Sequence, residues 1–255
     1  MKIALCASEV VPFAKTGGLA DVAGALPIAL EKEKQDVVVV MPGYKSIFAN
    51  PKFKVTRFKE GVSYAVIGKK TKVFFIENEK FFNRDQLYGD KAGDYPDNLD
   101  RFSYYCKRTL ELLKEIEFKA DVIHCHDWQS ALIPVFLKNL YARDPFYKKT
   151  KAILTIHNIG YQGLFSKDEF SKLGLDWSLF TMETLEFFDK VNILKGGIVF
   201  SDFVTTVSPT YSKEIQTKQF GFGLEGILTK RGSAVQGILN GLDYDIWNPE
   251  TDAYI

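Results

Sequence analysis

Short apolar runs alternate with amphipathic stretches along most of this chain. Residues 3–7 and 37–41 are continuous apolar runs of strand length. Between them, the apolar residues follow the spacing of one helix face: Leu19, Val22, Ala23, Leu26 and Leu30. A strand, a helix and a second strand in this order predict a βαβ unit and therefore a parallel sheet.

The same alternation resumes in the second half of the chain. A long amphipathic helix is expected over 99–116. After it, the pattern predicts strands at 122–125, 152–156, 203–207 and 234–239. Helices are expected between and beside them, over 130–140, 178–200 with a break near Asp189, 209–217 and 224–230.

Residues 53–77 have a different pattern. Three short β-rich runs, 53–59, 62–67 and 72–76, are separated by glycine-containing turns, which predicts antiparallel hairpins. A polar loop follows around residues 88–98. The whole pattern predicts an α/β fold, a Rossmann-like and mostly parallel sheet flanked by helices, with a β-hairpin insertion.

Composition narrows the function classes. The 255 residues are 46% hydrophobic and 25% charged, with a formal net charge of +1, so neither nucleic acid nor an anionic membrane surface is an expected partner. The apolar runs are too short to span a bilayer, and the N-terminus lacks the pattern of a signal peptide, so a cytoplasmic location is expected. The three cysteines lie far apart among apolar residues, which favours buried, reduced thiols.

A glycine turn follows the first predicted strand. Lys15, Thr16, Gly17 and Gly18 stand where that strand passes into a helix. The free amides of a first helical turn, close backbone approach at glycine and a lysine suit a phosphate or phosphosugar. The string is neither a P-loop nor a dinucleotide fingerprint, so a structural turn with a solvated lysine remains an equal alternative. Asp21 either favours the helix dipole or pairs with Lys15.

Polar side chains collect after the predicted strands. In an open parallel sheet, ligands bind beyond the carboxyl ends of the strands. The residues found there are Ser8-Glu9, Pro42-Gly43-Tyr44, His126-Asp127-Trp128, His157-Asn158, Ser208-Pro209 and Asn240-Gly241. Turn chemistry explains some of these residues, but two histidines and an Asp-Trp pair indicate a site at this edge.

Several of these residues have more than one possible role. His124 and His126 share one face of a strand, but a zinc site needs more ligands, so we expect no metal, one buried hydrogen-bonded histidine and one at the rim. Asp127 can orient a sugar hydroxyl, act as a base or cap the next helix. Trp128 can stack on a sugar or pack in the core. His157 can donate to a sugar or be structural, and the absence of a Gly-x-Ser-x-Gly motif disfavours an acyl hydrolase.

Taken together, the motifs resemble the bacterial glycogen synthases and plant starch synthases. The matching strings are Ser8-Glu9 with Pro12, Lys15-Thr16-Gly17-Gly18-Leu19-Ala20-Asp21-Val22, Asp97-Asn98 with Arg101-Phe102, His124-Cys125-His126-Asp127-Trp128, Thr155-Ile156-His157-Asn158 with Tyr161-Gln162-Gly163, Val207-Ser208-Pro209-Thr210-Tyr211, Gly223-Leu224-Glu225-Gly226, and Gly237-Ile238-Leu239-Asn240-Gly241-Leu242-Asp243 with Trp247-Asn248-Pro249. They span nearly the whole chain in the family's order. Gln129 departs from the pattern, since some relatives have a third histidine there.

The resemblance implies a glycosyltransferase of the GT-B fold, in which two Rossmann-like domains enclose the active site. Residues 1–241 would form the N-terminal domain, and 242–255 would begin the connection to a second, nucleotide-binding domain absent from this chain. The chain is then expected to be inactive alone, with that missing domain as its partner.

The implied reaction is the retaining transfer of glucose from ADP-glucose to the non-reducing end of an α-1,4-glucan in glycogen biosynthesis, without metal or cofactor. Lys15, His157 and Asp127 would be catalytic, and Lys15, Gly17, Gly18 and His157 would face the donor. The resemblance extends substrate binding to Glu9, Asp21, Tyr95, Asn98, Trp128, Asn158, Asn240 and Gly241. Two alternatives stay open: a sucrose-type synthase of the same fold, and a non-catalytic glucan-binding module.

Overall fold

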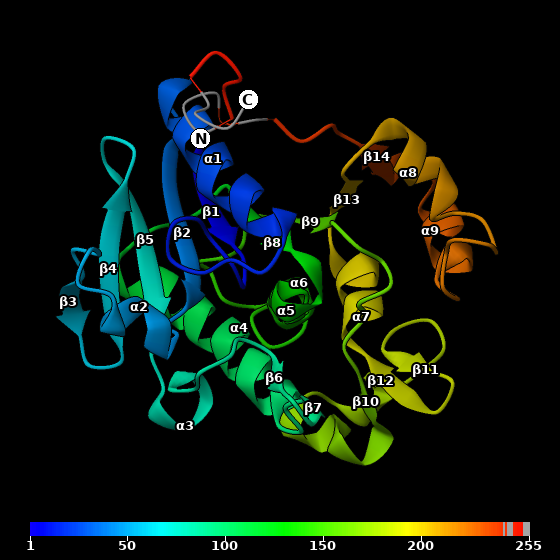
Figure 1. The fold of residues 1–255 in the computed structure, drawn as a ribbon. Helices are drawn as coiled ribbons and strands as arrows, with labels where there is room; N and C mark the ends of the chain where they lie inside the picture. The colour runs from blue at the N-terminus through cyan, green and yellow to red at the C-terminus, as the bar shows by residue number, and fades with distance from the viewer. Residues whose placement is uncertain (242, 244–246, 252–255) are drawn as a thin grey trace.

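A nine-stranded sheet forms the centre of the computed structural model, which describes residues 1–241, 243 and 247–251 (Figure 1). Its strand order is β14-β13-β9-β8-β1-β2-β5-β4-β3. The parallel strands are β1 (Lys2–Cys6), β2 (Asp36–Pro42), β5 (Thr71–Ile76), β8 (Val122–His126), β9 (Lys151–Ile156), β13 (Phe203–Thr206) and β14 (Val235–Gly237). At one edge, β4 (Val62–Ile67) is antiparallel to both β5 and β3 (Thr56–Lys59).

The sheet changes its direction of growth at β1. The chain passes from β1 to β2 on one side, and later places β8 on the other side of β1. At such a switch point the two following loops diverge and leave a crevice beyond the carboxyl ends of the strands. The crevice therefore lies between the loop after β1 and the loop after β8.

Helices cover both faces of this sheet (Figure 1). Helix α1 (Gly18–Lys32) packs against β2 and β5. Helix α4 (Asn98–Glu115) also packs on β2 and β5, and α6 (Leu132–Lys138) packs between α4 and α7 (Ile193–Phe200). Continuous apolar strands between two helical layers form the core, in which the three cysteines are buried and free.

The remaining elements are short. The helices are α2 (Lys45–Ala49), α3 (Glu79–Phe82), α5 (Asp127–Ser130), α8 (Pro209–Glu214) and α9 (Glu225–Arg231), with the 3-10 turns η1 (Lys167–Leu173), η2 (Trp177–Leu179) and η3 (Gly232–Ala234). Two small sheets join β6 (Gly89–Asp90) to β7 (Gly93–Asp94), and β12 (Lys190–Asn192) to β10 (Leu164–Ser166) and β11 (Glu186–Phe187). Within the described ranges, no helix is long and apolar enough to cross a membrane.

The predicted fold class is confirmed, but the helix expected over 178–200 is wrong for most of its length. That segment contains part of η2, then β11 and β12, and becomes helical only at Ile193. Phe188 and Asp189 have φ angles of 49° and 61°, so two consecutive left-handed residues turn the chain into a hairpin. Leu185, which precedes β11, and Val191 of β12 are buried, so the hairpin packs against the rest of the protein.

Other boundaries differ by a few residues. The expected strand 53–59 is β-structured only from Thr56, and the expected helix 130–140 is divided at Ala131 into α5 and α6. The polar loop at 88–98 carries the β6–β7 hairpin. Of the expected connection 242–255, residues 242, 244–246 and 252–255 lie outside the described residues.

Candidate active site

A cleft of about 550 Å³ lies at the carboxyl ends of β1, β8, β9 and β13. Its walls come from the loops that follow these strands and from the segment around residues 88–98. Nine of the predicted site residues line it: Glu9, Gly17, Gly18, Asn98, Asp127, Trp128, His157, Asn158 and Asn240. The other four, Lys15, Asp21, Tyr95 and Gly241, do not line it.

Glu9 organises the glycine turn. Its buried carboxylate accepts hydrogen bonds from the Thr16 amide, the Thr16 hydroxyl (2.7 Å), the Gly17 amide (3.3 Å) and the Tyr88 hydroxyl (2.7 Å). The Gly17 amide is thus directed at Glu9. Gly18 begins α1, and the first amides of a helix have no intrahelical acceptor. The capacity of this turn to bind an anion therefore lies at the start of α1, from Gly18 onward.

Lys15 is held beside the cleft by an ion pair. Its Nζ lies 2.7 Å from Asp21 Oδ1 and 5.9 Å from the centre of the Trp247 ring. The Lys15 and Asp21 side chains are 46% and 34% exposed, and an ion pair this exposed contributes at most about 1 kcal/mol. Of the two roles considered for Asp21, the structure shows pairing with Lys15. The pair therefore contributes little to the stability of the fold.

Buried Arg101 anchors the segment 79–97, which carries the predicted site residue Tyr95. Arg101 is fully buried and donates to two carbonyls of that segment and to Asn98 Oδ1 (2.6 Å). Asn98 in turn donates to the Tyr88 carbonyl (2.8 Å). The ring of Tyr95 lies against the Arg84 and Arg101 guanidinium groups, 4.6 and 5.0 Å away. Tyr88, which no sequence motif singles out, lines the cleft instead.

Asp127 joins the ends of β8 and β9. It has a φ of 55° and is 9% exposed, and its Oδ1 accepts the amide of His157 (2.7 Å). The Asn158 amide also favours the charged form, but burial dominates and raises the pKa of Asp127 to about 7. It does not cap the helix it begins, whose N-cap is His126 without a side-chain bond. Asp127 therefore positions the loop that carries His157.

Of the two roles considered for Trp128, the structure shows packing in the core. Its ring is 8% exposed and packs edge-to-face on Phe102, with ring centres 4.9 Å apart, and against Phe165. It also lines the cleft. Gly163 lies so close that a Cβ there would come within 2.4 Å of the indole. The chain thus needs glycine at 163 to let this wall of the cleft form.

Three histidine rings stack behind the cleft. The centre of the His126 ring lies 4.2 Å from that of His124 and 5.2 Å from that of His157. His126 Nδ1 is 2.9 Å from His157 Nε2, and His124 Nε2 is 2.6 Å from Thr155 Oγ1. Burial lowers the pKa of His124 and His157 to about 4 and that of His126 well below its usual range, so all three are neutral at pH 7.

The histidine stack was also compared with the requirements of a metal site. Among the residues that the structure describes, no group of three or more His, Cys, Asp or Glu residues is placed to hold a metal ion. His126 is fully buried, and His124 is partly exposed and lines a different cavity from the cleft.

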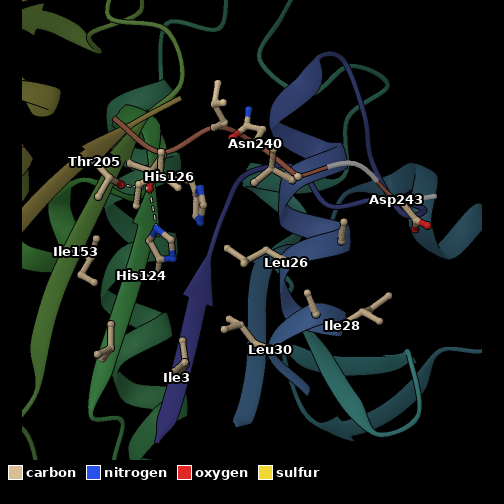
Figure 2. Close-up of a pocket in the computed structure, with 18 of the residues that line it drawn as sticks. Ile3, Leu26, Ile28, Leu30, His124, His126, Ile153, Thr205, Asn240 and Asp243 are labelled. Carbon is tan, nitrogen blue, oxygen red and sulfur yellow. Dashed lines mark hydrogen bonds between the residues drawn. The ribbon is translucent and has the colours of Figure 1, made fainter. Parts of the chain in front are cut away.

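A second cavity, of about 530 Å³, lies between α1 and the sheet (Figure 2). Leu26 and Leu30 of α1 face Ile3 across it, and His124 and His126 stand at its polar end (Figure 2). Gly241 lines this cavity, and Asn240 lines both it and the cleft. Its wall is mostly aliphatic, whereas most of the residues that line the cleft are polar.

Comparisons with known proteins agree with this geometry. A family model described as the starch synthase catalytic domain matches residues 2–230. Glycogen synthase from Geotalea uraniireducens is 48% identical over 99% of this chain, and glycogen synthase 2 from Geobacter sulfurreducens is 46% identical over 100% of it. The chain spans 54% and 55% of those two relatives, about half their length.

Among solved structures, the catalytic domain of starch synthase IV from Arabidopsis thaliana, determined with ADP and acarbose bound, superimposes with a TM-score of 0.86. It is 35% identical in sequence, and the match covers 99% of this chain and 54% of that one.

Proposed function

Because this chain belongs to the starch synthase catalytic domain family, we propose that it forms the N-terminal half of a retaining glucosyltransferase of the GT-B fold. The donor is ADP-glucose, and the acceptor is the non-reducing end of an α-1,4-glucan such as glycogen. A second, nucleotide-binding domain faces the cleft and completes the enzyme. We place the reaction in the cytoplasm and assign it no metal or cofactor.

One observation carries the proposal: the polar groups that the family motifs contribute converge on a single cleft at the switch point of the sheet. They come from loops separated by more than a hundred residues, yet they line one cavity of about 550 Å³. A crevice of this kind, with the start of a helix at its rim, suits an anionic ligand.

On the donor side, the work is electrostatic. The leaving diphosphate gains charge as the glycosidic bond breaks, and the start of α1 at Gly18 and the ammonium group of Lys15 stabilise it. His157 contacts the donor glucose, and Asp127 holds the backbone of His157 in place. The two buried carboxylates of the cleft, Glu9 and Asp127, accept hydrogen bonds from the protein itself, so neither is free to attack the sugar. This favours front-face transfer assisted by the leaving group.

On the acceptor side, the proposal assigns contacts with the glucan to Asn98, Trp128 and Asn158, which line the same cleft. Glu9 acts there through Tyr88 and the glycine turn that it organises. Asp21, Tyr95 and Gly241 lie outside the cleft wall. Their assignment as substrate-binding residues stays a prediction.

The test is glucosyl transfer by the full-length gene product that carries this chain. Radiolabelled ADP-glucose should label glycogen, and Lys15→Ala and His157→Ala should each lower kcat by about 100-fold or more. Lys52→Ala removes an exposed lysine and is the control. If both site variants keep wild-type turnover, the site assignment is wrong. Labelling of sucrose instead of glycogen identifies a sucrose-type synthase, and glucan binding without any transfer identifies a binding module.

A further inference from the structure

The bond between His126 and His157 joins two neutral imidazoles, so one ring must donate and the other must accept. His126 Nδ1 and His157 Nε2 are 2.9 Å apart. Burial keeps both rings neutral at pH 7. A neutral imidazole carries one N–H, and the hydrogen bond at one nitrogen decides which of the two nitrogens holds it.

The surroundings of His126 distinguish the two possible arrangements. His126 is fully buried, and its Nε2 has no hydrogen-bond partner among the described residues. This ring stands at the end of the cavity whose opposite wall is aliphatic (Figure 2). If His157 donated, the proton of His126 would sit on Nε2 as a buried N–H without an acceptor. If His126 donates from Nδ1, Nε2 keeps only an unused lone pair. Orphaned buried N–H groups are the rarer and costlier defect.

We propose that His126 donates its Nδ1–H to His157 and thereby holds His157 as the tautomer that carries its own proton on Nδ1. His157 lines the cleft, and its Nδ1 has no partner in the part of the chain that the structure describes. A residue of the cleft wall thus carries a hydrogen-bond donor that no protein group among the described residues uses. The opposite tautomer would offer only an acceptor. His126 is a positioning residue that acts through His157.

The orientation of the strands makes this bond possible. His126 ends β8, and in the parallel register it lies opposite Thr155 of β9, two residues before His157. Asp127, the next residue, holds the His157 amide. Two consecutive residues of one strand end thus fix both the backbone and the ring of His157.

The tautomer of His157 does not depend on the proposed function, but its catalytic consequence rests on that function. If the cleft holds a nucleotide sugar, the His157 Nδ1–H donates to an oxygen of the donor glucose. A donor held in place before the reaction stabilises charge that develops there, whereas a ring in the wrong tautomer cannot. Loss of the group that orients a metal-binding histidine typically costs about 10- to 100-fold in activity, and we expect a loss of the same size when His157 loses its orienting partner.

The tautomers can be measured directly on this chain, without any activity. It contains three histidines, and all of them lie in the stack. Two-bond ¹H–¹⁵N correlation spectra near pH 7.5, assigned with single histidine variants, report which nitrogen of each ring is protonated. We expect the proton on Nδ1 in both His126 and His157. A proton on Nε2 in both rings overturns the proposal.

Kinetics in the full-length protein supply the second test. His126→Asn places an amide near the position of Nδ1, whereas His126→Gln places it near that of Nε2. We expect His126→Gln to lose about 10- to 100-fold in kcat with KM for ADP-glucose changed by less than about 3-fold, and His126→Asn to keep most of the activity. Thermal unfolding of both variants controls for folding.

The outcomes separate this inference from the proposed function. Equal losses in the two variants, or wild-type kcat in His126→Gln, overturn the positioning role. If the wild-type protein transfers no glucose, the proposed function fails. The spectra still decide the tautomers of the histidine stack in that case.

Discussion

The stability of this chain should depend on pH through Asp127. Its carboxyl is buried at the end of β8, where the amide of His157 donates to it but no basic side chain among the described residues pairs with it. Burial raises its pKa from the usual 3.8 to about 7. Asp127→Asn keeps a carbonyl oxygen for the His157 amide and removes the ionisable group. The substitution therefore isolates how much the ionisation of Asp127 lowers the free energy of unfolding.

Whether stability rises or falls with pH depends on which state, folded or unfolded, binds the proton of Asp127 more tightly. Between pH 4 and pH 7 the unfolded chain has lost the proton of Asp127 while the folded chain keeps it, so wild-type stability falls as the pH rises through this range. The full effect of the pKa shift is about 4 kcal/mol, of which about 2.5 kcal/mol falls between pH 5 and pH 8. Burial lowers the pKa values of the three histidines, so these residues make the folded chain less stable as the pH falls. That loss occurs equally in wild type and variant, so it cancels in their difference.

Urea unfolding followed by far-ultraviolet circular dichroism, at pH 5 and at pH 8, measures this difference. The stability of Asp127→Asn relative to wild type should rise by about 2.5 kcal/mol from the lower pH to the higher. Asp36→Asn, at an exposed position, controls for the loss of a carboxylate in general. If the relative stability of Asp127→Asn changes by less than about 0.5 kcal/mol between the two pH values, burial does not control the ionisation of Asp127.

Three further substitutions test the architecture around the cleft by the same unfolding measurement. Glu9→Ala removes the carboxylate that four donors share and should cost about 2–4 kcal/mol, whereas Glu9→Gln, which keeps an acceptor for the amides, should cost about half as much; equal costs would contradict the role given to the carboxylate. Gly163→Ala combines a φ of 63° with a Cβ 2.4 Å from Trp128 and should cost more than about 2 kcal/mol, while Gly226→Ala, in a helix with open space around it, should be neutral or stabilising by up to about 1 kcal/mol. Arg101→Met leaves the carbonyls of Phe81 and Leu87 and the Asn98 Oδ1 without this donor and should cost about 3 kcal/mol or more; a smaller loss would show that the segment at 79–97 is anchored elsewhere.

The hydrophobic pattern alone determined the parallel sheet and the edge at which the site lies. Continuous apolar runs of strand length, separated by helix-spaced stretches, have few other ways to be buried, and parallel strands bring their carboxyl ends to one edge. For that reason the pattern groups Glu9, Asp127, His157 and Asn240 at one edge of the sheet, and all four line the cleft. The hydrophobic pattern did not identify the family, whereas the motifs along the chain did.

The pattern failed where tertiary contacts override local spacing. The hairpin within 178–192 depends on two left-handed residues and on burial against the rest of the protein. Tyr88 reaches the cleft because Arg101 holds its segment from a buried position. Neither effect is visible in a window of ten or fifteen residues.

The roles of the individual side chains were decided only by the tertiary structure. Tyr88 and Glu9 are 79 residues apart, and His157 is 30 residues from Asp127 and 31 from His126. A sequence shows which side chains can donate and accept, but strand order and register decide which of them meet. The sequence therefore located the cleft, and the pairing of β8 with β9 made Asp127 and His126 the supports of His157.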